Sequence, residues 1–121
     1  MTNNRKLGDF GEKLAQKYLE REGYEIVGRN YHKRGGEIDI IALDEGQFVF
    51  VEVKTRSTSA FGSPAEAVTL RKQKKMILTA KSYLLEKNGD LENFRLDAVS
   101  VELDCDGRRA NIRHYKSISN D

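Results

Sequence analysis

The chain of 121 residues contains one cysteine, one proline and no tryptophan, so it has few residues that cross-link a small protein or interrupt its helices and strands. A lone Cys105 excludes an internal disulfide and a zinc site built from several cysteines. No run approaches the roughly 18 apolar residues that cross a bilayer, and residues 1–9 lack the apolar stretch of a secretory signal. We therefore expect a cytoplasmic protein with no membrane partner, folded as a single domain over residues 1–121.

What the chain does have is charge, and the charge is arranged in blocks. The formal net charge of +2 is the sum of +3 over residues 1–34, −5 over 35–53, +6 over 54–87 and −2 over 88–121. An acidic block between two basic blocks suits a divalent cation beside a polyanion such as nucleic acid. A mixed, solvated surface is the alternative interpretation at this stage.

Hydrophobic periodicity and turn residues predict the order helix, three strands, helix, two strands. The first helix is expected over 4–22, ended by Gly23, and the second over 64–87, with Pro64 in its first turn and Ser63 as its N-cap. Its inner face is expected to carry Leu70, Met76, Ile77, Ala80, Tyr83 and Leu84. The strands are expected at 24–31, 37–43, 47–55, 94–103 and 109–115, the last two joined by a turn at Asp106-Gly107. This order predicts an α/β domain with a mixed sheet flanked by helices.

The central hairpin brings acidic side chains together. A two-residue turn at Glu45-Gly46 places Asp39 directly opposite Glu52 and Glu37 directly opposite Lys54. Strand alternation puts all four side chains on one face, where opposed Cβ atoms lie about 4.5–5.5 Å apart. Two carboxylates at that separation repel each other unless a cation lies between them, and Mg²⁺ prefers carboxylate oxygens.

The neighbours of these charges are apolar on both faces of the hairpin, as in a covered sheet. The opposite face is expected to hold Ile38, Ile40, Ala42, Val49, Val51 and Val53, and the charged face also holds Ile41, Phe48 and Phe50. Charges in such surroundings are costly unless they are paired or bound to a metal. A cross-strand ladder of salt bridges remains an alternative, and a three-residue turn would break the pairing altogether.

Two stretches, GEIDIIA at 36–42 and FVEVKTR at 50–56, resemble the YraN-like uncharacterised bacterial family, as do FGSP at 61–64 and the Lys-rich second helix. Asp39 followed by Glu52-Val53-Lys54 is similar to the D…ExK core of the PD-(D/E)xK nuclease superfamily. The resemblance covers roughly residues 5–103. It implies the restriction-endonuclease-like α-β-β-β-α-β core, here with an extra C-terminal strand.

The YraN-like family is itself similar to archaeal Holliday-junction resolvases. In those enzymes the first helix carries a glycine followed four residues later by a functional glutamate, as Gly8 and Glu12 do here. The sequence departs from the superfamily pattern at two places. Ile38 occupies the proline position of the motif, and Gln73 is not followed four residues later by the tyrosine that some members carry.

The resemblance implies a Mg²⁺- or Mn²⁺-dependent endonuclease that hydrolyses DNA phosphodiester bonds, with branched, Holliday-junction-like DNA among the candidate substrates. It implies metal ligation by Asp39, Glu52 and the carbonyl of Val53. Lys54 would orient the attacking water or contact the phosphate, and Glu12 would hold a metal-bound water or a second ion. The catalytic candidates are therefore Asp39, Glu52, Lys54 and Glu12. A homodimer is expected by the same analogy.

Basic, aromatic and amide side chains bracket the acidic strands and are candidates for binding nucleic acid. They are Tyr31, His32, Lys33, Arg34, Arg56, Arg71, Lys72, Gln73, Lys74 and Lys75. Solvated surface charge is the alternative for each one taken singly. Two other functions remain open: a nucleic-acid-binding module of the same fold that does not cut, and an interaction protein that presents its basic helix to an acidic partner.

Overall fold

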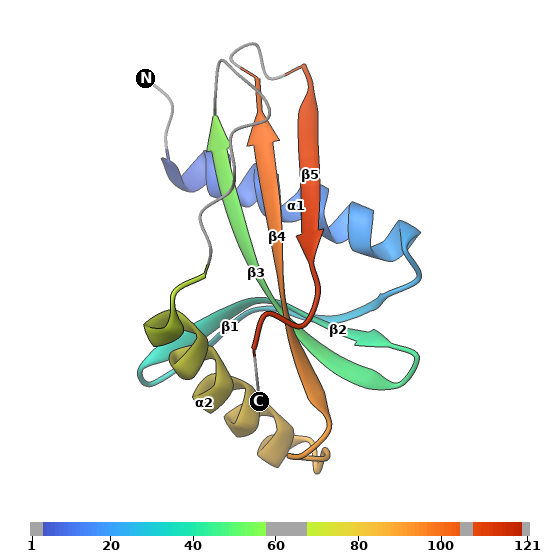
Figure 1. Cartoon of the computed structure of the whole chain (residues 1–121), viewed down its shortest axis with the longest axis vertical. Helices are drawn as coiled ribbons and strands as arrows, with labels where there is room; N and C mark the ends of the chain where they lie inside the picture. The colour runs from blue at the N-terminus through green and yellow to red at the C-terminus, as the bar shows by residue number, and fades with distance from the viewer. Residues whose placement is uncertain (1–3, 58–67, 105–107, 120–121) are drawn as a thin grey trace.

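The computed structural model describes residues 4–57, 68–104 and 108–119, and it forms one mixed five-stranded sheet with a helix on each face (Figure 1). The elements are α1 (Asn4–Arg21), β1 (Glu25–Lys33), β2 (Gly36–Asp44), β3 (Gln47–Ser57), α2 (Leu70–Glu86), β4 (Phe94–Leu103) and β5 (Ala110–Tyr115). The strands are ordered β1-β2-β3-β4-β5, with β3 and β4 parallel and the other neighbours antiparallel. The predicted α/β class and element order are confirmed.

The end of α1 follows the predicted glycine rule. Gly23 has a φ of 94°, a left-handed conformation that an L side chain adopts only with strain. The backbone N–H of Tyr24 then donates to the carbonyl of Leu19 at 2.9 Å, which satisfies one of the last carbonyls of the helix. Leu19 and Tyr24 are both buried, so this turn directs the chain from α1 straight into the sheet.

The β2–β3 hairpin has the predicted turn and register. Glu45 and Gly46 have φ values of 51° and 86°, as a two-residue turn with two left-handed residues requires. The ladder pairs Asp44 with Gln47 and continues to the pair Ile40 and Val51.

Beyond that pair, the ladder between β2 and β3 ends. β2 stays paired with β1 as far as Gly36, whereas β3 stays paired with β4 as far as Ser57. Figure 1 shows the consequence: β1 and β2 run across the molecule while β3, β4 and β5 continue together in another direction. The predicted direct pairing of Asp39 with Glu52 is therefore not part of the ladder, and both residues lie where the two strands part.

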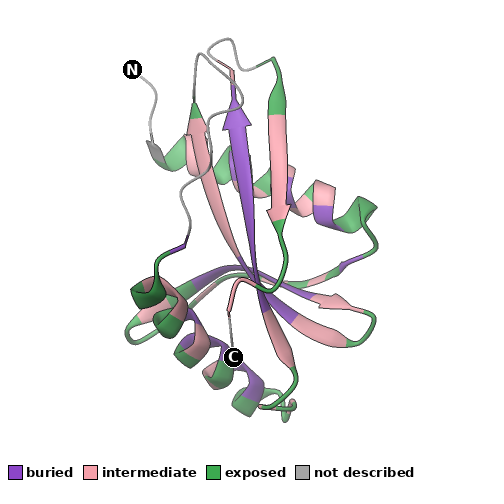
Figure 2. Ribbon diagram, viewed as in Figure 1, coloured by how far each residue is buried: buried purple, intermediate pink, exposed green. Residues whose placement is uncertain are grey.

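Two hydrophobic clusters fill the two faces of the sheet. One lies under α1 and includes Ile40, Ala42, Val49, Val51 and Val99, with Val53 packed against it. The other lies under α2 and includes Ile41, Phe50, Met76 and Leu84, with Phe48 packed against it. β4 between them is buried along most of its length (Figure 2). The prediction that Ile38 and Ile40 share a face is wrong, because Ile38 packs in the α2 cluster while Ile40 packs under α1. The face changes at Asp39, where β2 separates from β3.

The second helix begins later than predicted. Thr69 is extended, with φ −64° and ψ 157°, and its side chain caps α2 by accepting from the N–H of Lys72 at 3.1 Å. A helix running unbroken from Pro64 is therefore wrong, although Ser63 and Pro64 themselves lie outside the described residues. Leu70 was expected on the inner face, but its 70% exposure places it outside.

A buried carboxylate joins the C-terminal half to the rest of the sheet. Asp97 on β4 is fully buried and accepts hydrogen bonds from Arg95, from the backbone N–H of Ser117 and from Tyr24, and its Oδ2 lies 2.7 Å from His114 Nε2. His114 thus has a structural role in the last hairpin. Cys105 and the Asp106-Gly107 turn lie outside the described residues. No described helix has the length and apolar character needed to cross a membrane.

Candidate metal and nucleic-acid site

The site lies where β2 and β3 part, and its centre is the Asp39 side chain. Asp39 is only 9% exposed, and its Oδ2 accepts a hydrogen bond from the backbone N–H of Val53 at 2.7 Å. The carboxylate thus takes up a backbone donor at the point where the β2–β3 ladder has stopped. Glu52 precedes Val53 on β3, and its side chain is 12% exposed. The structure therefore brings the two predicted carboxylates together in a place largely shielded from water.

Burial and mutual repulsion raise the pKa values of both acids. Burial is the main cause for Glu52, the charge of Asp39 adds to it, and the nearby ammonium of Lys72 opposes it, leaving the pKa of Glu52 raised to about 7. The pKa of Asp39 is also raised, chiefly by burial, although the Val53 N–H opposes the shift. The two sites together hold a proton more readily than two exposed acids would.

The third acid, Glu12, comes from α1 and is not a solvated side chain. It is 16% exposed, and its pKa is raised by burial and by the charge of Asp39. Its Oε1 lies 3.6 Å from Arg29 Nη2 on β1. Gly11, the residue before it, is packed against the side chain of Thr55 so closely that a Cβ there would overlap it. The missing side chain of Gly11 lets α1 approach β3 and so carries Glu12 toward Asp39.

A lysine from the other helix reaches the same carboxylates. Lys72 in the first turn of α2 places its Nζ 3.6 Å from Glu52 Oε1. The approach of α2 to the sheet again depends on a glycine, since a Cβ on Gly36 would overlap Thr79 Oγ1. Lys72 was expected to contact nucleic acid; in this structure its partner is Glu52.

The carboxylate oxygens of the site suit a hard divalent cation, although they are too few to enclose one. Among the described residues, Glu52 Oε2 and Glu12 Oε1 are buried oxygens without a hydrogen-bond partner. Such atoms are costly unless a cation or water satisfies them. No group of three or more His, Cys, Asp or Glu within the described ranges is arranged to hold a metal. Mg²⁺ typically uses one or two carboxylates and keeps several waters, so Asp39 and Glu52 are enough for a Mg²⁺ site but not for an all-protein cage.

The other residues of the charged strands are more exposed. Lys54 is partly exposed on β3, two residues beyond Glu52. Glu37 lies 3.3 Å from His32 Nδ1, so the ion pair seen for Glu37 is with β1. Arg56 donates to Glu102 at 3.0 Å, and Glu102 is fully buried on β4.

The predicted nucleic-acid residues have different surroundings. Tyr31 and Lys33 turn away, because the Tyr31 hydroxyl donates to Glu86 at 2.7 Å and Lys33 Nζ lies 2.8 Å from the same carboxylate. Gln73 donates to the carbonyl of Val68 at 2.8 Å and so supports the start of α2.

Three of the others line a cavity next to the carboxylates: Lys72, which is partly exposed, and His32 and Lys75, which are exposed. Arg34, Arg71 and Lys74 are exposed and do not line that cavity.

Sequence reasoning missed Arg29 and Gly11. Arg29 could have been found, because a two-residue turn at Arg34-Gly35 pairs it with Ile40, next to Asp39. Gly11 gave no signal, since its role depends on a contact with Thr55 across the fold. A Cβ on Gly8, by contrast, would meet nothing.

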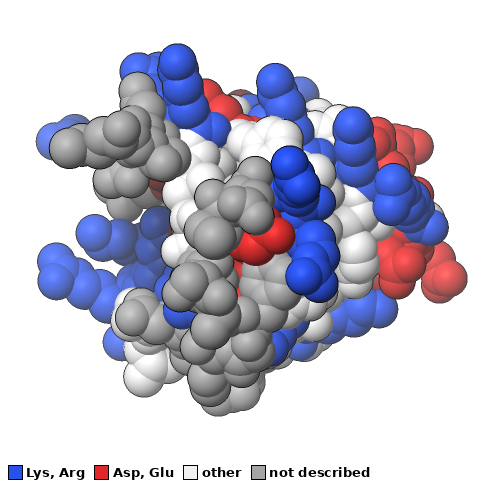
Figure 3. Space-filling view, turned by 90° about the horizontal axis from the view of Figure 1, so that it is seen from above, with Lys and Arg blue, Asp and Glu red and all other residues white. Residues whose placement is uncertain are grey.

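Both signs of charge are exposed at one end of the molecule. Figure 3 looks along the sheet from the end where β3 and β4 finish, and it shows Lys and Arg side chains at several places around the edge, with acidic side chains both near the centre and grouped at the right-hand edge. The positive charge on this surface is therefore interrupted by acidic groups.

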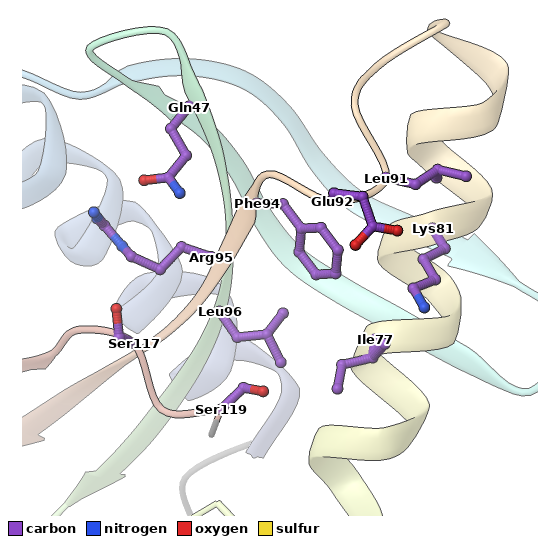
Figure 4. Close-up of a pocket in the computed structure, with 10 residues that line it drawn as sticks. All are labelled: Gln47, Ile77, Lys81, Leu91, Glu92, Phe94, Arg95, Leu96, Ser117 and Ser119. Carbon is purple, nitrogen blue, oxygen red and sulfur yellow. The ribbon is translucent and has the colours of Figure 1, made fainter. Parts of the chain in front are cut away.

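A larger cavity, of about 470 Å³, shares no lining residue with the carboxylate site. It lies between α2, the start of β4 and residues 117–119 (Figure 4). Ile77, Leu91 and Phe94 give it an apolar wall. Arg95, which also lines this cavity, already donates hydrogen bonds to Asp97 and Asp44. Size alone therefore does not identify the functional site.

Comparison with known proteins places the chain in a family. Residues 11–101 match the family described as "Uncharacterised protein family UPF0102", and this stretch contains Glu12, Asp39, Glu52 and Lys72. A UPF0102 protein of Alkaliphilus oremlandii is 48% identical over 102 residues, covering 83% of this chain and 87% of the relative.

Two further relatives extend the similarity. A UPF0102 protein of Clostridioides difficile is 46% identical over 101 residues, covering 84% of this chain and 89% of the relative. One from Nocardia farcinica is 46% identical over 112 residues, covering 93% and 87%. The resemblance to the YraN-like bacterial family is thereby confirmed, and the chain belongs to the uncharacterised protein family UPF0102.

Proposed function

We propose that this protein is a metal-dependent nuclease that hydrolyses phosphodiester bonds in DNA. One observation carries the proposal: Asp39 and Glu52, largely buried and with raised pKa values, face each other where β2 and β3 part, and one buried oxygen of Glu52 has no hydrogen-bond partner among the described residues. A purely structural pair of this kind would destabilise the fold. Such costs are common at sites that bind a cation or do chemistry.

The residues fit Mg²⁺ or Mn²⁺ held by Asp39 and Glu52, with the carbonyl of Val53 as the proposed third ligand. When bound, the ion supplies Lewis acidity, which makes a water more acidic and offsets the negative charge that builds on the phosphate. The carboxylates themselves position the cation and, once it is present, lose their mutual repulsion.

The chain's other polar groups have separate tasks in this proposal. Lys54 orients the attacking water or contacts the scissile phosphate, being two residues beyond Glu52 on the same strand. Glu12 accepts a proton or holds a water from the α1 side, and Arg29 keeps its carboxylate in place at 3.6 Å. Lys and Arg around the site neutralise the phosphates of the strand.

A non-catalytic nucleic-acid-binding module is the second candidate, and a specific observation favours it. Lys72 and Arg29 each lie 3.6 Å from one of the acids, so basic side chains already offset part of the negative charge. In that case the carboxylates hold α1 and α2 to the sheet, and no metal is needed.

Cleavage of a panel of DNA structures separates the two candidates. Duplex, single-stranded, flap and four-way-junction DNA are incubated with the protein and Mg²⁺ or Mn²⁺. We expect cleavage that falls at least about 100-fold in Glu52→Gln. DNA binding without cleavage in the wild type supports the binding module. Equal cleavage by wild type and Glu52→Gln contradicts the proposal, because the activity is then that of a contaminating nuclease.

A further inference from the structure

A second cavity, of about 270 Å³, lies beside the carboxylate site. Its lining comes from the β1–β2 turn and from the first half of α2: His32, Gly35, Gly36, Glu37, Lys72, Lys75 and Met76. Lys72 belongs to both places, since it lines the cavity and also lies 3.6 Å from Glu52. A group bound in the cavity would therefore be an immediate neighbour of a group bound at Glu52.

The charge of the lining favours an anion. Lys72 and Lys75 contribute two positive charges against the single negative charge of Glu37. Glu37 is itself paired with His32 at 3.3 Å, and both side chains are about half exposed or more. The cavity has one carboxylate and one apolar side chain, Met76, so it is suited neither to a metal ion nor to an apolar ligand.

The fold holds the two sides of the cavity close together. Gly36 begins β2 and lies against α2, where a Cβ would overlap Thr79 Oγ1 and would come within 3.4 Å of the Lys75 carbonyl. Gly35 has a φ of 90°, which lets the two-residue turn bring the strand back toward the helix. A two-residue turn therefore lies close against the helix, and the cavity does not depend on a long loop.

We propose that this cavity binds a phosphodiester group of the nucleic acid, the one adjacent in the strand to the phosphate at Asp39 and Glu52. The inference rests on the proposed function and adds to it the position of the strand. Lys75 neutralises the bound phosphate, Lys72 lies between the two phosphates, and Glu37 opposes binding. The nucleic-acid strand consequently runs from the point where β2 and β3 part toward the turn between β1 and β2.

The opposite charges of Lys75 and Glu37 allow a test with effects of opposite sign. Binding of fluorescently labelled duplex and four-way-junction DNA is measured by anisotropy in EDTA, at salt concentrations between about 50 and 200 mM. Lys75→Ala is compared with Lys81→Ala, which removes an exposed lysine from the second half of the same helix, away from this cavity. Glu37→Gln is measured in parallel, and thermal melts verify that all variants fold.

We expect Lys75→Ala to weaken binding roughly 3- to 10-fold and to reduce the slope of log K against log salt by about 0.9, the loss of one neutralised phosphate. Lys81→Ala should leave the slope unchanged, and Glu37→Gln should tighten binding. Equal effects of Lys75→Ala and Lys81→Ala, or weaker binding by Glu37→Gln, overturn the inference.

The failure of the inference can be told apart from failure of the proposed function, because EDTA removes any cleavage. If Lys75 and Glu37 act as expected but no DNA is cut with Mg²⁺, the phosphate site stands and the nuclease proposal falls. If DNA is cut but Lys75 behaves like Lys81, the nuclease proposal stands and this site falls. Absence of all DNA binding overturns both.

Discussion

Replacing Glu52 with glutamine should stabilise the metal-free protein, although it removes a candidate catalytic group. The side chain is 12% exposed, and its pKa is raised to about 7 from an ordinary value of 4.5, first by burial and then by the charge of Asp39. Charging Glu52 in the folded state therefore costs about 3 kcal/mol more than charging it in the unfolded chain. Glutamine is close in size and carries no charge.

The pH dependence follows from the direction of the shift. Because the folded-state pKa lies above the unfolded one, the folded protein binds more protons between about pH 4.5 and 7, and the metal-free wild type loses stability as pH rises through that window. The pKa of about 7 already includes the opposing attraction of Lys72, so the cost of charging Glu52 is a net one. We therefore expect a gain of about 3 kcal/mol at pH 8.5, or roughly 10 °C in Tm, and almost none at pH 4.5.

The assay is thermal unfolding followed by circular dichroism in EDTA across this pH range, with Glu20→Gln as the control because Glu20 is exposed on α1. A variant no more stable than the wild type at pH 8.5 would refute the reasoning. So would a gain of the same size at pH 4.5 and 8.5, since it would not come from the charge of Glu52.

Four other substitutions test three separate parts of the account. Lys72→Met should raise the affinity for Mn²⁺ several-fold in calorimetry, because it removes the cation that now lies 3.6 Å from Glu52; unchanged or weaker affinity would contradict this. Gly11→Ala should destabilise the fold by about 1–3 kcal/mol in denaturant unfolding, since its Cβ would overlap Thr55. Gly8→Ala should instead stabilise it by about 0.5–1 kcal/mol, because its Cβ meets nothing; effects of the same sign would refute the packing argument. Asp97→Asn should cost about 3–5 kcal/mol at pH 7, because Arg95 loses its fully buried carboxylate and keeps only the partly exposed Asp44. Although burial opposes it, hydrogen bonding by His114 and Arg95 lowers the pKa of Asp97, so wild-type stability from this group is lost only as pH falls below about 4, and the deficit of the variant should shrink there.

The hairpin shows how far the sequence could predict the site. The turn residues Glu45 and Gly46 determined the register of β2 and β3, and alternation correctly grouped the apolar residues that pack under α1. The parting of the strands at Asp39 was not predictable from that register, because it arises when β2 continues with β1 and β3 with β4. The sequence thus predicted two opposed carboxylates, and the structure adds that they lie where β2 and β3 part.

Contacts between distant elements account for most of what the sequence did not reveal. Lys72 meets an acid on another element, and neither periodicity nor local spacing carries information on that pair. The turn spacing could place Arg29 beside Asp39, but not opposite Glu12 on α1. The start of α2 was misplaced for a local reason: Ser63 and Pro64 offered a strong start signal, while Thr69 provides an equally good cap six residues further on. Val68 is buried just before Thr69, a tertiary contact that the local start signal does not carry.

The central claim is that Asp39 and Glu52 together bind a divalent cation. Isothermal titration of Mn²⁺ into the wild type, Asp39→Asn and Glu52→Gln tests it most directly, with Glu20→Gln as the matched control for an exposed acid. The account predicts one saturable site in the wild type and in the control, and its loss in both site variants. No binding by the wild type, or undiminished binding when either acid is replaced, would contradict it.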